Sequence, residues 1–229
     1  MEGAVINFQD VQIYQGKTLV LGDVTFEIQY GEFIYLIGKT GSGKSSLLKT
    51  IYGDLPLRSG TATVAGFSLQ GATWKNIPYL RRKLGIVFQD FQLLMDRSVE
   101  ENLAFVLRAT GTMDKALIKV KADEALRRVG LQNKGFKMPY ELSGGEQQRV
   151  VVARAIINDP VIILADEPTG NLDPETSDDI MQLLRHLNSE FKTAILMATH
   201  NYDILKKFPS HIMRCAGGKV SMEAASAIL

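Results

Sequence analysis

The feature that most constrains this chain is a compact apolar run followed directly by a glycine-rich loop and a helix. Residues 32–37 (EFIYLI) are predicted to form a buried strand, and residues 44–52 (KSSLLKTIY) a helix. The loop between them, residues 38–45, fits the pattern G-x-x-x-x-G-K-[ST]. Its glycines allow backbone N–H groups to turn toward a phosphate, and the start of the helix adds partial positive charge there. The stretch therefore predicts a phosphate-binding loop in one half of a βαβ unit.

Two side chains of this loop have specific roles in the prediction. Lys44 reaches the β- and γ-phosphates of a nucleotide, and the Ser45 hydroxyl is a ligand for Mg²⁺. The predicted nucleotide contacts are Gly38, Lys39, Thr40, Gly41, Ser42, Gly43, Lys44, Ser45 and Ser46. A guanine-specific protein would also carry Asn-Lys-x-Asp. Residues 133–136 (NKGF) lack the aspartate, so the sequence does not support guanine recognition.

A second candidate site is a pair of carboxylates that ends an apolar run at residues 161–167 (VIILADE). A charged pair at the end of a buried strand is costly unless a cation or hydrogen bonds meet it. Asp166 is therefore the expected partner of the Mg²⁺ held by Ser45, and Glu167 is placed to orient and polarise the attacking water. The alternative is a polar strand end that meets solvent.

The third pattern is the string LSGGEQQR at residues 142–149. Ser143 and Glu146 have the S-x-x-E spacing of a capping box, which predicts a helix over residues 146–158. Gly144 and Gly145 are poor helix formers and cost about 1 kcal/mol each relative to alanine. That cost is explained if the backbone must lie close to an anion at the start of the helix.

The same string resembles the signature of the ATP-binding cassette (ABC) ATPases, and the resemblance runs from Tyr14 to His200 and beyond. It implies that the protein binds ATP with Mg²⁺, hydrolyses ATP and pairs head to tail as an ATP-dependent homodimer. Ser143, Gly144 and Gly145 would then contact the nucleotide held by the opposing chain. Residues 171–173 match the loop that crosses between the two subunits.

The resemblance also assigns roles to three further side chains. Tyr14 is expected to stack on adenine. Gln89, after the predicted strand at residues 84–88, is expected to touch Mg²⁺ and water and to contact a transmembrane partner. His200, after the last core strand, is expected to contact the γ-phosphate. The alternatives are a sheet aromatic, a surface loop residue and a satisfied polar side chain, respectively.

Two longer strings narrow the resemblance to one branch of the family. Residues 87–97 (VFQDFQLLMDR) and 165–173 (ADEPTGNLD) are similar to the bacterial cell-division ATP-binding type, FtsE. This similarity implies a permease-like integral membrane partner of the FtsX type and a role in activating cell-wall hydrolysis at the septum. Lipoprotein-release and macrolide-export ATPases share the second string and remain the alternative. Leu93, Leu94 and Met95 are either a partner-docking surface or part of the core.

The patterns together predict an α/β fold with a P-loop NTPase core of the ABC ATPase type. Residues 5–11 and 21–28 are predicted to open an N-terminal antiparallel β-subdomain. Continuous apolar strands at residues 161–165 and 194–198 indicate a parallel sheet covered on both faces. The whole chain, 1–229, is expected to be one domain. Its core would comprise about 1–88 and 159–229, and an inserted helical subdomain would comprise about 89–158.

Composition excludes several other classes. Lysine and arginine number 26 against 25 aspartates and glutamates, which argues against a nucleic-acid partner. The single cysteine, Cys215, fits a reducing compartment. No apolar run approaches the roughly 20 residues of a membrane span, and no signal peptide is evident at the N-terminus. These features predict a cytosolic chain, and the resemblance implies that a membrane partner holds it at the cytoplasmic face of the inner membrane.

Three other classes of nucleotide-binding protein are each excluded by one feature of the sequence. DNA-repair and chromosome-maintenance ATPases insert a long coiled coil between the phosphate loop and the signature, but residues 45–142 show no sustained heptads. Translation-associated cassettes carry two modules in one chain, and this chain has one. A nucleotide-sensing scaffold would lack the general base, whereas Glu167 is present.

Overall fold

A computed structural model describes residues 3–223, so residues 1–2 and 224–229 of the expected domain lie outside the described part. The order of elements is β1 (Ala4–Gln15), β2 (Thr18–Gln29), β3 (Phe33–Ile37), α1 (Lys44–Ile51), β4 (Ser59–Val64), β5 (Phe67–Ser68), α2 (Ile77–Arg81), β6 (Leu84–Val87), α3 (Val99–Ala109), α4 (Lys115–Arg128), the 3₁₀ helix η1 (Pro139–Glu141), α5 (Gly144–Ile156), β7 (Ile162–Asp166), α6 (Pro174–Phe191), β8 (Ala194–Ala198), α7 (Tyr202–Lys207), β9 (His211–Ala216) and β10 (Lys219–Glu223).

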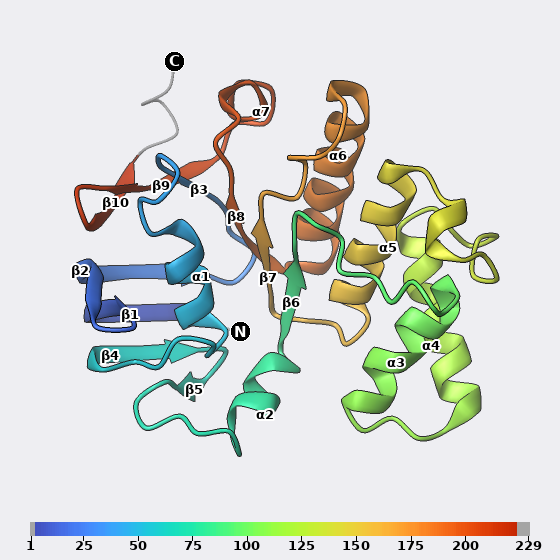
Figure 1. Ribbon diagram of the computed structural model, residues 1–229, viewed down its shortest axis with the longest axis horizontal. Coiled ribbons are helices and arrows are strands. Elements are labelled where there is room, and N and C mark those ends of the chain that lie inside the picture. The colour runs from blue at the N-terminus through green and yellow to red at the C-terminus, as the bar shows by residue number, and fades with distance from the viewer. Residues whose placement is uncertain (1–2, 224–229) are drawn as a thin grey trace.

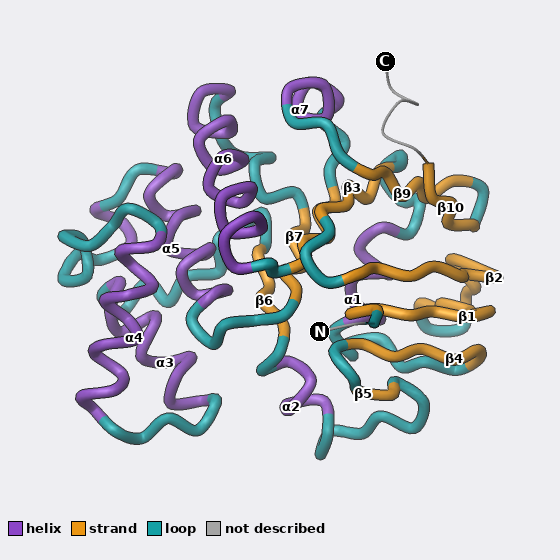
Figure 2. Tube along the Cα trace, turned by 180° about the vertical axis from the view of Figure 1, so that it is seen from behind, coloured by secondary structure: helices purple, strands orange, loops and turns teal. Residues whose placement is uncertain are grey.

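The molecule is arranged from side to side as two sheets and a group of helices. Figure 1 shows β1, β2, β4 and β5 at one side, α3–α5 at the other, and β8, β7 and β6 of the second sheet between them. Seen from behind in Figure 2, α6 lies between these central strands and α5. The predicted α/β class, with antiparallel N-terminal strands and a parallel sheet, is confirmed.

The central sheet has the strand order β10-β9-β3-β8-β7-β6. All neighbours in it run parallel except β9 and β10, which form an antiparallel pair at one edge. Successive side chains of a strand point to opposite faces. Accordingly Phe33, Tyr35 and Ile37 join a core with the helices α3–α6, whereas Ile34 and Leu36 join a second core with β1, β2 and α1. Burial on both faces explains why these strands are continuously apolar.

The first sheet has the order β2-β1-β4-β5 and is antiparallel. β1 passes so close to β4 that a Cβ on Gly60 would lie 2.5 Å from the Asp10 carbonyl oxygen, and Gly60 has φ +82°. Asp10 also has a positive φ, 52°, where the pairing of β1 with both neighbours shifts register. β1 nevertheless continues to Gln15, beyond the predicted residues 5–11.

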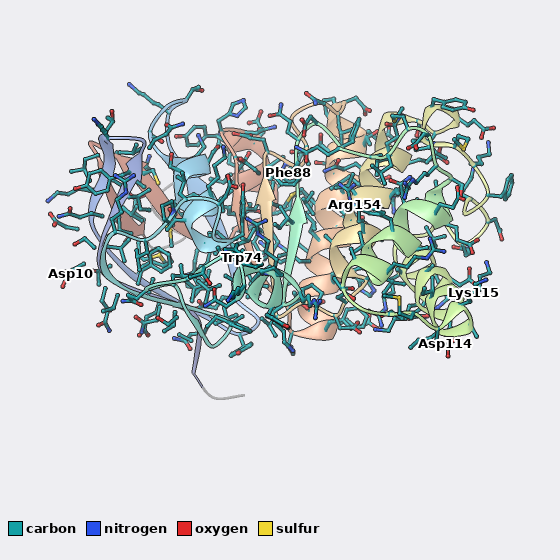
Figure 3. All side chains as sticks on the ribbon, turned by 60° about the horizontal axis from the view of Figure 1, so that its bottom comes forward. Asp10, Trp74, Phe88, Asp114, Lys115 and Arg154 are labelled. Atoms are coloured by element: carbon teal, nitrogen blue, oxygen red, sulfur yellow. The ribbon has the colours of Figure 1, made fainter. Side chains whose placement is uncertain are left out.

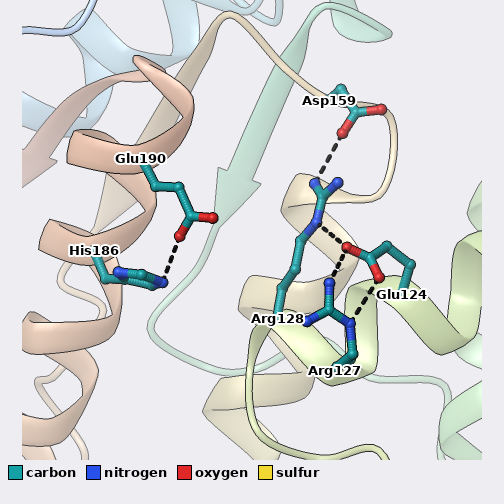
Figure 4. Close-up of polar contacts among 6 residues, drawn as sticks. All are labelled: Glu124, Arg127, Arg128, Asp159, His186 and Glu190. Atoms are coloured by element: carbon teal, nitrogen blue, oxygen red, sulfur yellow. Dashed lines mark hydrogen bonds and ion pairs between the residues drawn. The ribbon is translucent and has the colours of Figure 1, made fainter.

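Helices α3, α4 and α5 pack against one another and bury apolar side chains in a shared core. Ser98 caps α3 and Ser143 caps α5, each in a capping box. Figure 4 shows how the end of α4 is tied to the turn before β7. Arg128 pairs with Glu124 on its own helix and with Asp159 at 2.9 Å.

The predicted elements need two corrections, one to the start of a helix and one to the number of strands. α5 begins at Gly144, two residues before the predicted start, because Ser143 is the N-cap and both glycines lie within the first turn. The sequence analysis also did not identify β4, β5, β9 and β10. These short strands mix apolar residues with polar or small ones, as in SGTATV of β4 and HIMRCA of β9, and thus lack a continuous apolar run.

Within residues 3–223, no helix combines the length and apolar character needed to cross a bilayer.

Candidate functional site

A cleft of about 830 Å³ opens at the carboxyl ends of β3 and β7. Five stretches of the chain meet there. Its lining consists of Gln15, Val20, Thr40, Gly41, Gly43, Lys44, Ser45, Ser46, Lys49, Phe88, Gln89, Asp90, Asp166, Glu167, Asn171 and His200. The cleft therefore brings together residues from the predicted phosphate loop, the carboxylate pair, the glutamine and the histidine.

The phosphate loop is a close-packed backbone cradle. A Cβ on Gly38 would lie 2.4 Å from the Cys215 carbonyl oxygen, so the loop can approach β9 only with glycine there. Gly43, at φ +108°, has the Leu21 side chain 2.8 Å from the position of a Cβ. The Ser42 hydroxyl is buried and has no hydrogen-bond partner among the described residues. An orphaned donor in a backbone cradle is the arrangement expected of a group that binds an added anion.

Lys44 is the first residue of α1 and is only 8% exposed. Its Nζ donates to the Gly38 carbonyl oxygen at 2.8 Å and lies 3.4 Å from that of Lys39. These contacts hold the ammonium group against the backbone of the phosphate loop. The first turn of α1 contains no acidic residue, so its positive end is not compensated from within the helix.

Asp166 lies at the end of β7, and its environment is unfavourable for an ionised carboxylate. Burial raises the pKa of Asp166 above its ordinary value, and the negative charge of Glu167 raises it further. A hydrogen bond with Ser45 and the charges of Lys44 and Lys49 act in the opposite direction. A cation placed beside Asp166 and Ser45 would remove this penalty.

Glu167 has a strained backbone and a fixed side chain. Its φ is +51°, a conformation that is rare outside glycine, and its N–H donates to the Ala198 carbonyl at 3.0 Å. His200 Nδ1 lies 2.8 Å from Glu167 Oε1, and the histidine side chain is 67% exposed against 15% for the glutamate. Strain of this kind is typical of functional sites, where the surrounding structure holds a side chain in one direction.

Gln89 follows β6 and is bonded to the segment after the carboxylates. Gln89 Nε2 donates to Asn171 Oδ1 at 3.2 Å, and Asn171 Nδ2 donates to the Gln89 carbonyl at 3.0 Å. A Cβ on Gly170 would lie 2.8 Å from Gln89 Nε2, so a larger residue there would displace the glutamine side chain. The glutamine thus borders the cleft beside Glu167.

The other predicted contacts lie apart from these residues. Ser143, Gly144 and Gly145 do not line the cleft. Ser143 accepts from Glu146 N at 3.2 Å, and a Cβ on Gly145 would lie 2.5 Å from Thr176 Cγ2 on α6. Tyr14 does not line the cleft either. Its hydroxyl donates to Gln12 at 2.8 Å and the Arg58 guanidinium lies 5.3 Å from its ring centroid, while Gln15 and Val20 form the nearby wall.

The sequence analysis missed one residue that shapes the glutamine loop. Arg154 on α5 donates to the carbonyl oxygens of Phe91 at 2.9 Å and Gln92 at 2.5 Å. Both of these loop residues have positive φ, 56° and 49°. A signal was available, since Arg154 is the one charged residue in the apolar stretch VVVARAI of α5. α5 thereby joins the signature at its start to the glutamine loop near its end.

The residues present fit a magnesium nucleotide. Within residues 3–223 no group of three His, Cys, Asp or Glu side chains could hold a metal on its own. Mg²⁺ in phosphate-transfer sites is bound by one or two protein groups and otherwise by water and phosphate oxygens. Ser45 and Asp166, beside an anion cradle, provide that incomplete set. The loop, the carboxylate pair and the histidine define the site of a nucleotide hydrolase.

Comparisons with known proteins identify the family. The ABC transporter family profile matches residues 21–170. The chain is 42% identical over 218 residues to the cell division ATP-binding protein FtsE of Streptococcus pneumoniae, covering 95% of this chain and 94% of that one. It is 44% identical over 200 residues to the protein of the same name from Mycobacterium tuberculosis, covering 87% and 86%.

A solved structure agrees with these matches. The ATP-binding cassette MJ0796, described as a dimer in a post-hydrolysis state bound to ADP and Pi, superposes with a TM-score of 0.83 at 32% identity. The match covers 96% of this chain and 98% of that one. The chain therefore belongs to the ABC transporter family, and it is an ATP-hydrolysing enzyme.

We expect Asp166→Asn to stabilise the fold and to abolish ATP hydrolysis. Because the folded-state pKa of Asp166 is raised, the native protein binds the proton more tightly than the unfolded chain, and wild-type stability falls as pH rises through that pKa. We expect the nucleotide-free variant to have a higher Tm than wild type at neutral pH, and the difference to shrink at acidic pH. Magnesium-dependent hydrolysis should be lost.

Thermal unfolding across pH measures this effect, with Asp96→Asn as a control in which the side chain is 77% exposed. A lower Tm for Asp166→Asn at neutral pH would contradict the assigned cause.

Proposed function

We propose that the protein is the ATP-hydrolysing subunit of an ABC-type membrane complex that acts in bacterial cell division. The supporting observation is that the cleft collects the phosphate loop, the carboxylate pair, Gln89 and His200 in a chain closely similar to proteins named for cell division. In this proposal the backbone of residues 38–45 cradles the phosphates of ATP and Lys44 neutralises their charge. Ser45, Asp166 and Gln89 hold Mg²⁺, whose chemistry when bound is to neutralise charge on the phosphate oxygens.

Glu167 acts as the general base for the attacking water. Its carboxylate is held by the strained backbone and by His200, so it points in one direction before substrate arrives. His200, the more exposed of the two, is free to contact the γ-phosphate while it keeps its bond to Glu167. Such pre-organisation reduces the rearrangement required during the reaction.

One chain supplies only part of the site. Ser143, Gly144 and Gly145 lie at the start of α5 and outside the cleft, so they are available to a nucleotide on another chain. A symmetric head-to-tail dimer would use each of the two surfaces twice. The similarity to MJ0796, described as a dimer, supports this arrangement. ATP would then join the two chains, and hydrolysis would release them.

Glu167→Gln should slow turnover while ATP binding persists. Loss of a positioned base typically costs about 10²–10⁴ in rate. We expect the variant to accumulate as an ATP-bound dimer in size-exclusion chromatography, because hydrolysis no longer separates the chains. Turnover measured with purified protein gives the first quantity and elution volume with ATP the second.

The chain offers a matched control for this experiment. Glu190 also pairs with a histidine, His186 Nε2, at 2.7 Å on the exposed side of α6 (Figure 4). Glu190→Gln removes a similar pair outside the cleft and should leave turnover unchanged. Full activity of Glu167→Gln would contradict the assignment of the base.

The proposed membrane partner docks in a groove beside the glutamine loop. This groove of about 370 Å³ is lined by Leu94, Phe105, Val106 and Arg154, among others. Leu93 is 9% exposed and belongs to the core, Leu94 lines the groove, and Met95 is 51% exposed. Leu93 is therefore part of the core, whereas Leu94 and Met95 are placed to contact a docked partner. Movement of a partner segment in this groove would reach Gln89 through the loop that Arg154 holds.

For this partner we propose a permease-like integral membrane protein of the FtsX type, which holds the chain at the cytoplasmic face of the inner membrane. ATP-driven closing of the dimer would change the shape of the partner and activate cell-wall hydrolysis at the septum. The cell-division names of the relatives support this function over the alternative, a lipoprotein-release or macrolide-export ATPase.

Leu94→Asp combined with Met95→Asp should uncouple the complex. The two carboxylates would be buried against the partner, whereas ATP hydrolysis by the isolated protein should persist because neither residue lines the cleft. We expect septation defects with normal lipoprotein trafficking in cells that carry only this variant.

Met113→Asp with Leu117→Asp is the matched control, since these side chains are 76% and 45% exposed and lie outside the groove. Stalled lipoprotein release with normal division would favour the alternative function.

A further inference from the structure

The stretch between Leu55 and Gln89 has an unusual charge composition. It contains five cationic side chains, Arg58, Lys75, Arg81, Arg82 and Lys83, and no aspartate or glutamate. The whole chain is nearly neutral, with a formal charge of +1. Positive charge is thus concentrated in this stretch and balanced by acidic residues elsewhere. The stretch is part of neither the phosphate loop nor the signature.

The same stretch exposes two large aromatic side chains. Trp74 is 80% exposed and Tyr79 is 56% exposed. Each lies beside a cation: Lys75 Nζ is 5.6 Å from the Trp74 ring centroid and the Arg82 guanidinium is 5.0 Å from that of Tyr79.

The cations of this surface are available to a ligand. Within residues 3–223, neither Lys75, Arg82 nor Lys83 forms an ion pair, whereas Arg81 is engaged with Asp54 and with the Tyr52 carbonyl. We define the basic aromatic surface as Trp74, Lys75, Tyr79, Arg82 and Lys83.

This surface adjoins the proposed docking groove. A second cavity of about 360 Å³ is lined by Tyr79, Arg82 and Lys83 together with Thr110 and Asn158, and the last two residues also line the groove. Figure 3 turns this side of the molecule forward and shows Trp74 in the same view as Phe88 and Arg154 of the groove. A partner embedded in the membrane and seated in the groove would bring the surface toward the bilayer.

We propose that the basic aromatic surface contacts the anionic headgroups of the membrane directly, in addition to any protein partner. Tryptophan and tyrosine favour the interface between headgroups and acyl chains, where one end of the ring is apolar and the other is wet. Lysine and arginine near an anionic bilayer add about 1 kcal/mol each, or roughly a fivefold increase in affinity. The proposal rests on the proposed function only for the orientation of the chain, since lipid binding itself requires no partner.

The shape of the surface favours a lipid over an acidic protein segment. Trp74 stands out from the protein on the turn between β5 and α2, where it makes few contacts of its own. A protein partner usually holds an exposed aromatic anchor in a complementary pocket, and the apolar groove nearby already offers concave contact. A fluid bilayer accommodates a protruding ring without a preformed shape.

Trp74 is the single tryptophan of the chain, so its fluorescence tests the proposal directly. The full chain without nucleotide or partner is titrated with vesicles of phosphatidylcholine alone, and with vesicles of equal parts phosphatidylcholine and phosphatidylglycerol. We expect a blue shift of the emission only with the anionic vesicles. Raising the salt to about 1 M, where the Debye length is about 3 Å, should reverse the shift.

Two variants separate the charge contribution from non-specific adsorption. Lys75→Ser with Lys83→Ser should lower the partition coefficient about 25-fold, from roughly fivefold for each charge. Phe136→Ser with Lys137→Ser removes an exposed aromatic and a neighbouring cation elsewhere and should leave partitioning unchanged, as judged by the same blue shift.

Three results would overturn the proposal: an equal shift with neutral vesicles, no shift with anionic vesicles, or a Trp74 shift that appears only when a detergent-solubilised membrane partner is added. The last result would assign the surface to protein contact. None of them bears on ATP hydrolysis, so failure here is distinguishable from failure of the proposed function.

Discussion

Parallel pairing of β3, β8 and β7 in one register determines where the phosphate loop, Glu167 and His200 lie. Leu36 of β3 and Asp166 of β7 both pair with Ala198 of β8, so the three strands end at the same level. The next residues along the chain enter the phosphate loop, the Glu167 turn and the segment with His200. A slip of two residues in either pairing would move one of these groups by about 7 Å, beyond reach of a common phosphate. The geometry of the site therefore depends on the backbone hydrogen bonds that hold these strands in register.

The site was predictable from sequence where its residues are adjacent in the chain. The phosphate loop and the carboxylate pair each follow a continuous apolar strand, and such strands are recognisable because both faces are buried. The bonds between Gln89 and Asn171 join residues 82 positions apart, and no local pattern reports such a contact. Strands β4 and β9 were not predicted for a related reason. Their mixed sequences are stabilised by pairing with β1 and β3, which lie far away in the chain.

α5 connects the signature to the glutamine loop. Its first residues carry the signature and are held by a capping box, and Arg154 near its end holds the loop that borders the groove. A rigid helix of this kind can transmit a displacement from one end to the other. Partial burial of Arg154 lowers its pKa and costs free energy, yet its side chain fixes two loop residues with positive φ. The same helix therefore relates the surface that we propose for an opposing chain to the groove that we propose for a membrane partner.

We propose that each ATP site is completed by the signature of another chain. ATP turnover by a mixture of Lys44→Ala and Ser143→Arg chains, each inactive alone, tests this claim. In a mixed dimer the intact loop of the Ser143→Arg chain meets the intact signature of the Lys44→Ala chain, which rebuilds one site. Random pairing of equal amounts then restores about a quarter of wild-type turnover if the sites act independently. Turnover no greater than that of the separate variants, with both chains folded, would contradict the claim.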